Sequence, residues 1–339
     1  MYAAALDLRK AFDSVSHFKL FSSLLRAGVP PPIVDIIHCW YSKLFVQIRW
    51  NHSLSFSFRV GSGVLQGSLF SPTLFNFFIN VLITNLRVSD IGCHIDKVFV
   101  GIFVYADDIF ILSPSLMGLQ YMVDNCINTC DMLSLVINSD KSFCIAFGRS
   151  RKLDLAPIYV KNNNIHWVDS LHYLGVTIVS GAEPTFCYNK TKRSFYAAFN
   201  NVMSRAKSLE QLLQLSLVES YCLPLLTYAC GALCYSQQQM HELNVCWNNV
   251  FRTIFFFNKW ESVKSFICGL GRLNFVYLVK LARVKFFFHL MQSDNHLLYD
   301  LFFIYIRERF ALDDCLKLIF LSRSQAIRSV YRQFSADLL

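Results

Sequence analysis

Charged residues are scarce in this sequence: they make up 16% of its 339 residues, whereas 54% are hydrophobic and 32 are phenylalanine. So apolar a composition raises the question whether this is a membrane protein. The lengths and interruptions of the charge-free stretches answer it. The two longest cover residues 60–86 and 220–240, and glycine, proline or polar residues interrupt both. Neither supplies the about 20 unbroken apolar residues that a bilayer-spanning helix needs. These interruptions argue against an integral membrane protein and favour buried core helices.

Paired cysteine motifs are also missing. The sequence has twelve cysteines but no CxxC pair, and the closest spacings are Cys126/Cys130 and Cys230/Cys234. No histidine stands in ligand register beside them, so the pattern argues against zinc and is typical of reduced thiols that pack as small hydrophobic side chains. We also find no internal repeat, low-complexity tract or clear linker, and the N-terminus lacks the basic start of a signal peptide.

The charges that are present are unbalanced. Lysine and arginine number 32 against 23 aspartates and glutamates, which gives a formal net charge of +9. This surplus suits a polyanionic partner, although a need for solubility would also explain it. The length allows one large or two ordinary domains with a real core.

Two adjacent aspartates, Asp107 and Asp108, stand between two apolar runs in the segment VFVGIFVYADDIFIL at residues 98–112. The pattern predicts a strand, a tight turn and a strand. A solvated hairpin turn is the simplest interpretation. However, the turn has no glycine or asparagine to supply a positive φ, and both of its flanks are apolar. Carboxylates at the edge of a buried sheet typically bind a divalent metal, because a cation offsets their repulsion.

The opening segment predicts a short apolar strand that runs into a helix continuing to about Arg26. Asp7 falls at the end of this strand, where sheets often place catalytic groups. Asp13 stands where a helix cap would, so a capping role remains open for it. Helical spacing returns over residues 33–41 and 275–291. Loose alternation over residues 45–60 predicts a hairpin.

A glycine-rich stretch at residues 61–72 precedes an apolar helix that should continue to about Leu86. Three glycines before a helix allow close approach of a ligand to the backbone and to the free N–H groups of the helix N-terminus. Pro72 suits the first turn of this helix, with Ser71 as its cap. The Gln66 side chain can hydrogen-bond the edge of a base or sugar.

Together these segments resemble the reverse transcriptases of non-LTR (LINE-type, jockey-like) retrotransposons. The segments similar to that family's motifs A to E occur in the family's order, at residues 6–13 (LDLRKAFD), 63–75 (GVLQGSLFSPTLF), 105–108 (YADD), 135–142 (LVINSDKS) and 173–176 (YLGV). The resemblance is close through about Ile178. It is much less specific over residues 221–257.

The resemblance implies an RNA-directed DNA polymerase that adds nucleotides by two-metal-ion chemistry. Such chemistry needs two divalent ions about 3.5–4 Å apart, and hard oxygen ligands favour Mg²⁺, with Mn²⁺ possible in its place. The implied metal ligands are Asp7, Asp107 and Asp108. Lys141 would protonate or neutralise the leaving pyrophosphate, although a solvated surface lysine is the alternative.

The same resemblance assigns residues to the substrates, which would be an RNA template, a DNA primer and deoxynucleoside triphosphates. Phe12 would be the aromatic gate that excludes a 2′-hydroxyl, unless it is an ordinary core phenylalanine. Gln66 and Gly67 would touch the incoming nucleotide or the template. Leu174 and Gly175 would form the turn that supports the primer end, or a plain hairpin turn. No membrane and no obligate protein partner is implied.

The expected fold is α+β. Residues 1–180 would form a reverse transcriptase palm with partial fingers, in which an antiparallel sheet is backed by helices. Residues 181–339 would form a mostly helical thumb and C-terminal extension. Five cations in residues 190–207, with no acidic residue among them, could contact phosphates, although a solvated helix face would look the same.

The sequence departs from the family at its start, because Met1 lies six residues before Asp7. Family members carry upstream fingers and usually an endonuclease, and a C-terminal Cys/His knuckle is missing as well. We therefore expect a truncated copy that has lost most or all polymerase activity while keeping its carboxylates. The alternative function is that of a catalytically inactive retrotransposon-derived fragment that at most binds nucleic acid.

Overall fold

The computed structural model describes residues 1–149, 155–309, 311 and 313–337. The chain divides into two compact units, Met1–Phe186 and Cys187–Leu339. This division falls a few residues after the boundary expected from the sequence. Each unit is described by itself below.

The first unit is built on a six-stranded sheet in the order β11-β12-β10-β1-β9-β8. The central strand β1 pairs antiparallel with β9 on one side and with β10 on the other, and β12 pairs parallel with β10. The six strands are β1 (Tyr2–Leu8), β8 (Ile102–Tyr105), β9 (Asp108–Ser113), β10 (Ile137–Ala146), β11 (Ile158–Val160) and β12 (Asn163–Trp167). The predicted strand–turn–strand of residues 98–112 is confirmed in β8 and β9.

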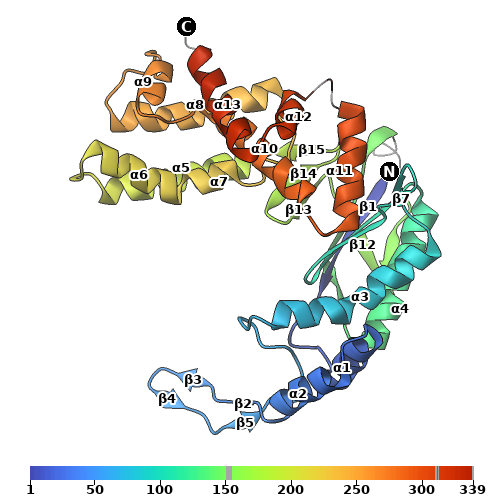
Figure 1. Cartoon of the computed structure of the whole chain (residues 1–339). Coiled ribbons are helices and arrows are strands. Elements are labelled where there is room, and N and C mark those ends of the chain that lie inside the picture. Colours follow the sequence, from blue (N-terminus) through green and yellow to red (C-terminus); the bar gives the residue numbers. More distant parts are fainter. Residues whose placement is uncertain (150–154, 310, 312, 338–339) are drawn as a thin grey trace. The chain divides into compact units, whose positions relative to one another are not determined.

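Four helices accompany this sheet, namely α1 (His17–Arg26), α2 (Pro31–Ser42), α3 (Ser71–Ser89) and α4 (Leu116–Leu133). Apolar residues recur at helical spacing along α3, so that Phe75, Phe78 and Leu82 all face the core and are fully buried. They belong to one cluster with residues of α4 and of the sheet, such as Leu6. Each such side chain stabilises the fold by roughly 1.5–3 kcal/mol. A sheet backed by helices confirms the α+β class (Figure 1).

The opposite face of the sheet is covered by the hairpin of β13 (Ser170–Tyr173) and β14 (Val176–Val179). Leu171 of β13 joins a buried cluster with Ala3 and Phe110 of the sheet. The hairpin turns at Leu174 and Gly175, whose φ angles are +44° and +77°. Positive φ at both central residues is what a two-residue hairpin loop of this kind requires. The turn is confirmed, and its contact with a primer stays a prediction.

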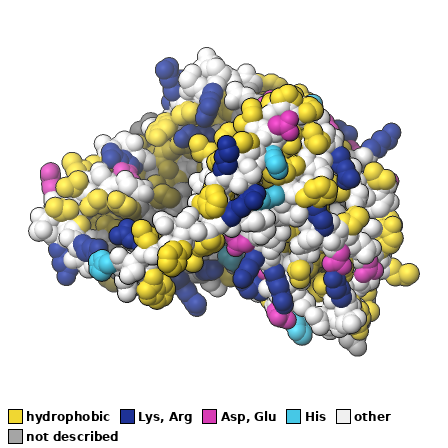
Figure 2. Space-filling view, turned by 90° about the horizontal axis from the view of Figure 1, so that it is seen from below, with side chains coloured by type: hydrophobic (Ala, Val, Ile, Leu, Met, Phe, Trp, Pro, Cys, Tyr) yellow, Lys and Arg dark blue, Asp and Glu magenta, His cyan; other side chains and the backbone are white. Residues whose placement is uncertain are grey.

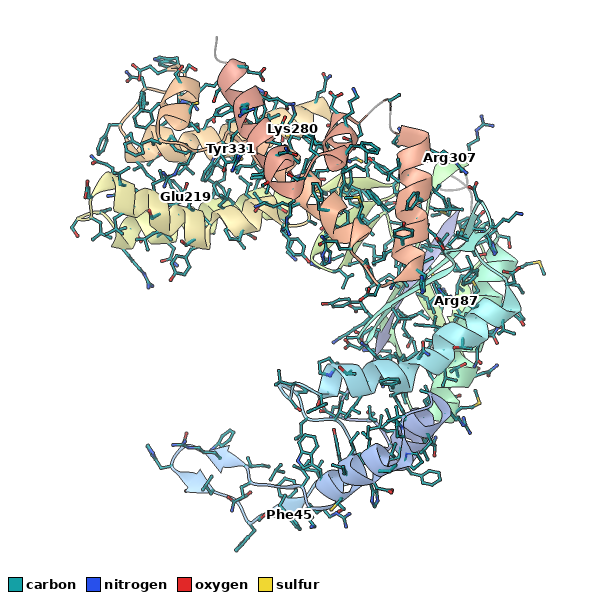
Figure 3. All side chains as sticks on the ribbon, viewed as in Figure 1. Phe45, Arg87, Glu219, Lys280, Arg307 and Tyr331 are labelled. Carbon is teal, nitrogen blue, oxygen red and sulfur yellow. The ribbon has the colours of Figure 1, made fainter. Side chains whose placement is uncertain are left out.

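A second hairpin lies between α2 and α3, where β2 (Phe45–Val46) pairs with β5 (Phe58–Arg59) and β3 (Arg49–Trp50) pairs with β4 (Ser53–Leu54). Asn51 at its tip has a φ of +52°, as a tight turn needs. Figure 3 labels Phe45 at the end of the hairpin next to α2. The remaining short strands are β6 (His94–Ile95), β7 (Val98–Phe99) and β15 (Thr185–Cys187).

The second unit is helical over most of its described residues. Its helices are α5 (Asn189–Arg205), α6 (Gln211–Tyr221), α7 (Leu223–Thr227), α8 (Gln237–Ile254), α9 (Lys264–Gly269), α10 (Phe275–Met291), α11 (His296–Arg309), α12 (Asp314–Lys317), the 3₁₀ helix η2 (Leu318–Phe320) and α13 (Arg323–Ala336). Trp247 of α8, Phe275 of α10 and Phe334 of α13 are almost fully buried. The helix predicted over residues 275–291 is confirmed as α10.

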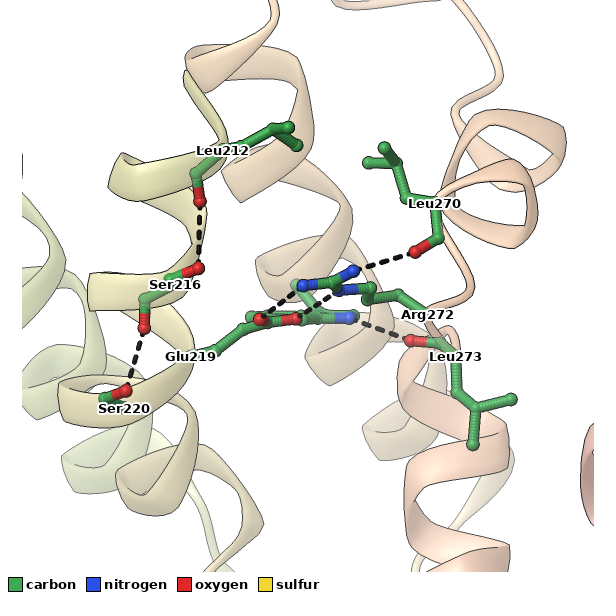
Figure 4. Close-up of polar contacts among 8 residues, drawn as sticks. Leu212, Ser216, Glu219, Ser220, Leu270, Arg272 and Leu273 are labelled. Atoms are coloured by element: carbon green, nitrogen blue, oxygen red, sulfur yellow. Dashed lines mark hydrogen bonds and ion pairs between the residues drawn. The ribbon is translucent and has the colours of Figure 1, made fainter. Parts of the chain in front are cut away.

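Polar contacts join α6 to the segment before α10 (Figure 4). The Arg272 guanidinium donates to both carboxylate oxygens of Glu219, at 3.1 and 3.3 Å, and to the carbonyl of Leu270 at 2.8 Å. The buried Trp247 indole donates to the Leu273 carbonyl. Bidentate pairs of this kind fix geometry more firmly than a single surface ion pair does.

The structure excludes the capping role that the sequence left open for Asp13, and the predicted cap at Ser71 is wrong. The first helix begins at His17 with Ser16 as its N-cap residue, so Asp13 does not cap it. The reason is tertiary: the backbone carbonyls of Phe12 and Val15 accept hydrogen bonds from Val64 and Gly63, which holds residues 9–14 in turns. Ser71 likewise lies inside α3 rather than capping it.

The cysteines of the described residues are all free. In the part of the chain that the structure describes, no helix is long and apolar enough to cross a membrane.

Candidate active site

The sheet register brings Asp7 and Asp108 together, although 101 positions separate them in the sequence. The pairing of β1 with β9 includes Leu6 opposite Ile109, so the next position on each strand is Asp7 and Asp108. Residues directly opposite each other in antiparallel strands have Cβ atoms about 4.5–5.5 Å apart. Asp107 precedes Asp108 in the turn from β8. The three predicted metal ligands therefore share one edge of the sheet.

The turn that presents Asp107 has only two residues, Ala106 and Asp107, between the paired Tyr105 and Asp108. Ala106 has a φ of +53°, a conformation that costs an L-residue roughly 1–2 kcal/mol. The sequence offered no glycine for this turn, and the structure places an alanine there instead. Such strain persists where the surroundings over-determine the backbone, which is common at functional sites.

The carboxylates affect one another. Partial burial raises the pKa of the Asp108 carboxyl above its usual value, and the nearby carboxylates of Asp107 and Asp7 raise it further. Three acidic groups at one edge supply the hard oxygen donors that Mg²⁺ or Mn²⁺ prefers, so their chemistry fits a divalent cation. Among the described residues, no three His, Cys, Asp or Glu side chains are arranged as a complete metal site. The fit therefore rests on proximity and donor chemistry.

Lys141 lies on the same side of the sheet as these carboxylates. A cavity of about 370 Å³ is lined by Asp7, Asp108 and Lys141, together with His172 and Tyr173 of β13. Burial, and then the charge of Asp108, raise the pKa of the Tyr173 hydroxyl to about 12. A second cavity of about 650 Å³ is lined by Asp7, Asp107 and Lys141 among others. The structure thus brings all four predicted catalytic residues together.

An irregularity in β10 explains how Lys141 reaches this place. Ala5 of β1 pairs with Phe143, but Asp7 pairs with Asn138, so residues 139–142 stand opposite Leu6 alone. This bulge carries Lys141. It is closed by Ser142, whose hydroxyl accepts from the Asp7 N–H at 3.2 Å and donates to the Asn138 carbonyl at 2.7 Å. Asn138 also donates to Asp7 Oδ2, at 3.3 Å.

Sequence reasoning missed Asn138 and Ser142. The available indication was the polar run Asn-Ser-Asp-Lys-Ser inside an apolar strand. Polar residues at buried positions of a strand need hydrogen-bond partners.

The residues predicted to touch the nucleotide lie on a neighbouring part of the unit. Phe12 is half-buried and its ring stacks on that of Phe75, with 4.7 Å between the centroids. Gln66 is exposed and donates to Asp13 Oδ1 at 3.2 Å. Gly67 has a φ of +88°. Phe12, Gln66 and Gly67 do not line the two cavities beside the carboxylates.

The glycine-rich loop packs against the turn after β1 and is hydrogen-bonded to it. Gly63 has a φ of +89°, and a Cβ there would lie 2.9 Å from the Asp13 carbonyl oxygen. His17 Nε2 donates to the Gly63 carbonyl at 2.8 Å. Only glycine allows this approach, which sets Gln66 beside Asp13.

Comparison with known proteins identifies the class. Residues 1–178 match the family described as reverse transcriptase (RNA-dependent DNA polymerase). This is more than half of the chain, which therefore belongs to the reverse transcriptase family. Members of this family generally use divalent metal ions.

The relatives are polymerases of non-LTR retrotransposons. The chain is 29% identical over 187 residues to the Retrovirus-related Pol polyprotein from type-2 retrotransposable element R2DM of Drosophila melanogaster, covering 53% of the chain and 18% of that protein. It is 26% identical over 181 residues to the RNA-directed DNA polymerase from mobile element jockey of the same organism, covering 52% and 19%. The matched part of the chain thus spans about a fifth of these relatives' own length.

Among solved structures, the chain is similar to telomerase from Candida albicans in complex with a TWJ fragment of telomeric RNA. The identity is 12% and the TM-score 0.46, over 97% of this chain and 50% of that chain.

The raised pKa of Asp108 leads to a stability prediction. Because folding favours the protonated form of this carboxyl, its ionisation destabilises the metal-free protein above the raised pKa, and this effect vanishes as the pH falls below the ordinary carboxyl pKa. Asp108→Asn should therefore raise the free energy of unfolding at pH 7, by up to about 1 kcal/mol. At about pH 3 the gain should be absent. Denaturant titration in EDTA at both pH values measures this, with the exposed Asp35→Asn as control. Destabilisation by Asp108→Asn at pH 7 would contradict a raised Asp108 pKa caused by burial and by the carboxylates of Asp107 and Asp7.

Proposed function

We propose that this chain is an RNA-directed DNA polymerase that transfers nucleotides by two-metal-ion chemistry at Asp7, Asp107 and Asp108. One observation carries the proposal. The register of β1 and β9 pairs Leu6 with Ile109, so Asp7 and Asp108 occupy the next position on each strand, and both line one cavity with Lys141. Two-metal-ion nucleotidyl transfer needs carboxylates that hold the metal ions, and here they come from separate strands. The ammonium group of Lys141 lies beside them.

Each group has a role in this proposal. The three aspartates would hold Mg²⁺, or Mn²⁺ in its place. When bound, the metal ions favour loss of the proton of a primer 3′-hydroxyl and stabilise the charge of the pyrophosphate that leaves. Lys141 stands at the cavity wall, where its ammonium group can protonate or neutralise that pyrophosphate.

The substrates in this proposal are an RNA template, a DNA primer and deoxynucleoside triphosphates. Phe12 would exclude a 2′-hydroxyl, and Gln66 and Gly67 would touch the nucleotide or the template. The turn at Leu174 and Gly175 follows Tyr173, which lines the cavity beside Asp108, and in this proposal the turn would support a primer end.

The charge of the chain supports a nucleic-acid partner. The net charge is +9, and Figure 2 shows Lys and Arg side chains spread over the face that it draws. Of the cations singled out in residues 190–207, four are exposed, namely Lys190, Arg193, Arg205 and Lys207. Lys192 is partly buried and pairs with Glu242. Exposed cations can contact phosphates without regard to sequence. We propose that residues 187–339 form the helical thumb and extension, and that residues 1–186 form the palm with partial fingers.

Primer extension on an RNA template tests the function. The chain is compared with Asp107→Ala, Asp108→Ala in Mg²⁺ or Mn²⁺, and the exposed Asp35→Ala is the matched control. We expect weak residual extension by the chain, which only the double variant abolishes. Extension that survives in the double variant would contradict the proposed site. No extension by a folded chain would contradict the proposed function and favour the inactive fragment that at most binds nucleic acid.

A further inference from the structure

We propose that Asn138 and Ser142 are positioning residues that set the orientation of the Asp7 carboxylate. This inference rests on the proposed function, because it assigns Asp7 to metal binding. It concerns the bulge of β10 at residues 139–142 and the hydrogen bonds that close it.

Ser142 anchors the backbone of Asp7. Its side chain is fully buried, and a buried hydroxyl without partners would be costly. It has two partners, since it accepts from the Asp7 N–H and donates to the Asn138 carbonyl. These bonds replace the ladder bonds that the bulge interrupts. They hold Asp7 in place, while Asp140 and Lys141 of the bulge are exposed.

Asn138 holds the side chain of Asp7. Its amide nitrogen lies 3.3 Å from Asp7 Oδ2, and its amide oxygen lies 3.5 Å from Arg9 Nη2. A guanidinium can only donate, so the amide oxygen must face Arg9 and the NH₂ group must face the carboxylate. Arg9 also forms an ion pair with Asp140 of the bulge, in which Arg9 Nη2 lies 3.7 Å from Asp140 Oδ2. Arg9, Asn138 and Asp7 therefore form a chain with only one favourable orientation of the amide.

This orientation matters because of the charges nearby. The Asp7 carboxylate stands at the same sheet edge as Asp107 and Asp108, and repulsion among the three would turn it away from them. A hydrogen bond from a neutral amide restrains the carboxylate without adding charge. Groups that orient metal ligands in this way typically change metal affinity or activity 10–100-fold when they are removed.

The same bulge also carries Lys141, so one irregularity in β10 positions two functional groups. If Asn138 had only a structural role, its loss would change the stability of the protein, and the affinity for metal would stay unchanged. The two roles can therefore be separated by measuring metal binding without nucleic acid.

The experiment measures Mn²⁺ affinity by isothermal titration calorimetry, together with the melting temperature, for the full chain and four variants. Asn138→Ala removes the amide. The matched control is Asn163→Ala, which removes an amide that donates to Ser139 of the same bulge and does not touch Asp7. Asp7→Asn removes the carboxylate itself. Arg9→Met, at a side chain that is 55% exposed, releases the Asn138 amide and leaves the bulge in place.

We expect Asn138→Ala to weaken Mn²⁺ binding about 10–100-fold, and Asn163→Ala to leave it within about 2-fold. Wild-type affinity in Asn138→Ala would overturn the positioning role. Should Asn138→Ala fail to fold, Arg9→Met decides the question, and unchanged Mn²⁺ affinity in that variant would overturn it. If Asp7→Asn binds Mn²⁺ as the wild type does, then the metal role of Asp7 has failed, and with it the proposed function at this site. That outcome is distinct from a failure of Asn138 alone.

Discussion

Asp7→Asn should lower the rate of primer extension by about 10³-fold or more while the protein stays folded. The substitution keeps the shape of the side chain and removes its charge. In the proposal, this charge is the part of the metal site that β1 supplies. Removing a single preorganised electrostatic group from an active site costs about 10²–10³-fold, and a metal ligand should cost at least as much.

Single-turnover extension on an RNA template measures this effect, with circular dichroism to verify the fold. The matched control is Asp35→Asn, which removes an exposed carboxylate on α2 and should leave the rate within about 2-fold. An equal loss in both variants would show that the effect is not specific to Asp7.

Phe12→Ala should raise the use of ribonucleotides relative to deoxynucleotides by about 10–100-fold. The prediction follows from the proposed gate, since a shortened side chain leaves room for the 2′-hydroxyl, and contacts of this size discriminate by about 1–3 kcal/mol. Phe12 also stacks on the buried Phe75, so the variant will lose stability as well.

The ratio of the two rates separates these effects, because a core defect slows incorporation of both nucleotides alike. Phe78→Leu is a suitable control, since Phe78 is fully buried and its ring also lies beside that of Phe75. Its ratio should remain that of the wild type. If Phe12→Ala also keeps the wild-type ratio, then Phe12 is an ordinary core residue.

Local sequence patterns were enough to predict the hairpin that carries Asp107 and Asp108 and the strand that ends near Asp7. Apolar runs of strand length on both sides of Asp107 and Asp108 predict β8 and β9 directly, because the pattern and the structure are both local. The regular helix α10 was predicted for the same reason. That Asp7 would meet Asp107, with Asp108 beside them, followed from the family resemblance, since pairing between distant strands leaves little trace in one sequence.

Long-range contacts decided what the sequence could not predict. Asp13 looks like a helix cap, but the glycine-rich loop binds the backbone around it and draws its side chain to Gln66. Ala106 adopts a positive φ that its residue type does not suggest. The bulge of β10 depends on the register between β1 and β10, so the roles of Asn138 and Ser142 became visible only in the structure.

The most direct test of this account is a titration of Mn²⁺, followed by electron paramagnetic resonance, into the wild-type chain and into Asp7→Asn and Asp107→Asn, Asp108→Asn. We predict that the wild type binds Mn²⁺ and that substitution on either strand removes this binding, because carboxylates from β1 and from the β8–β9 turn are proposed to form one site. If each variant binds Mn²⁺ as the wild type does, these aspartates do not form a metal site, and the central claim is wrong.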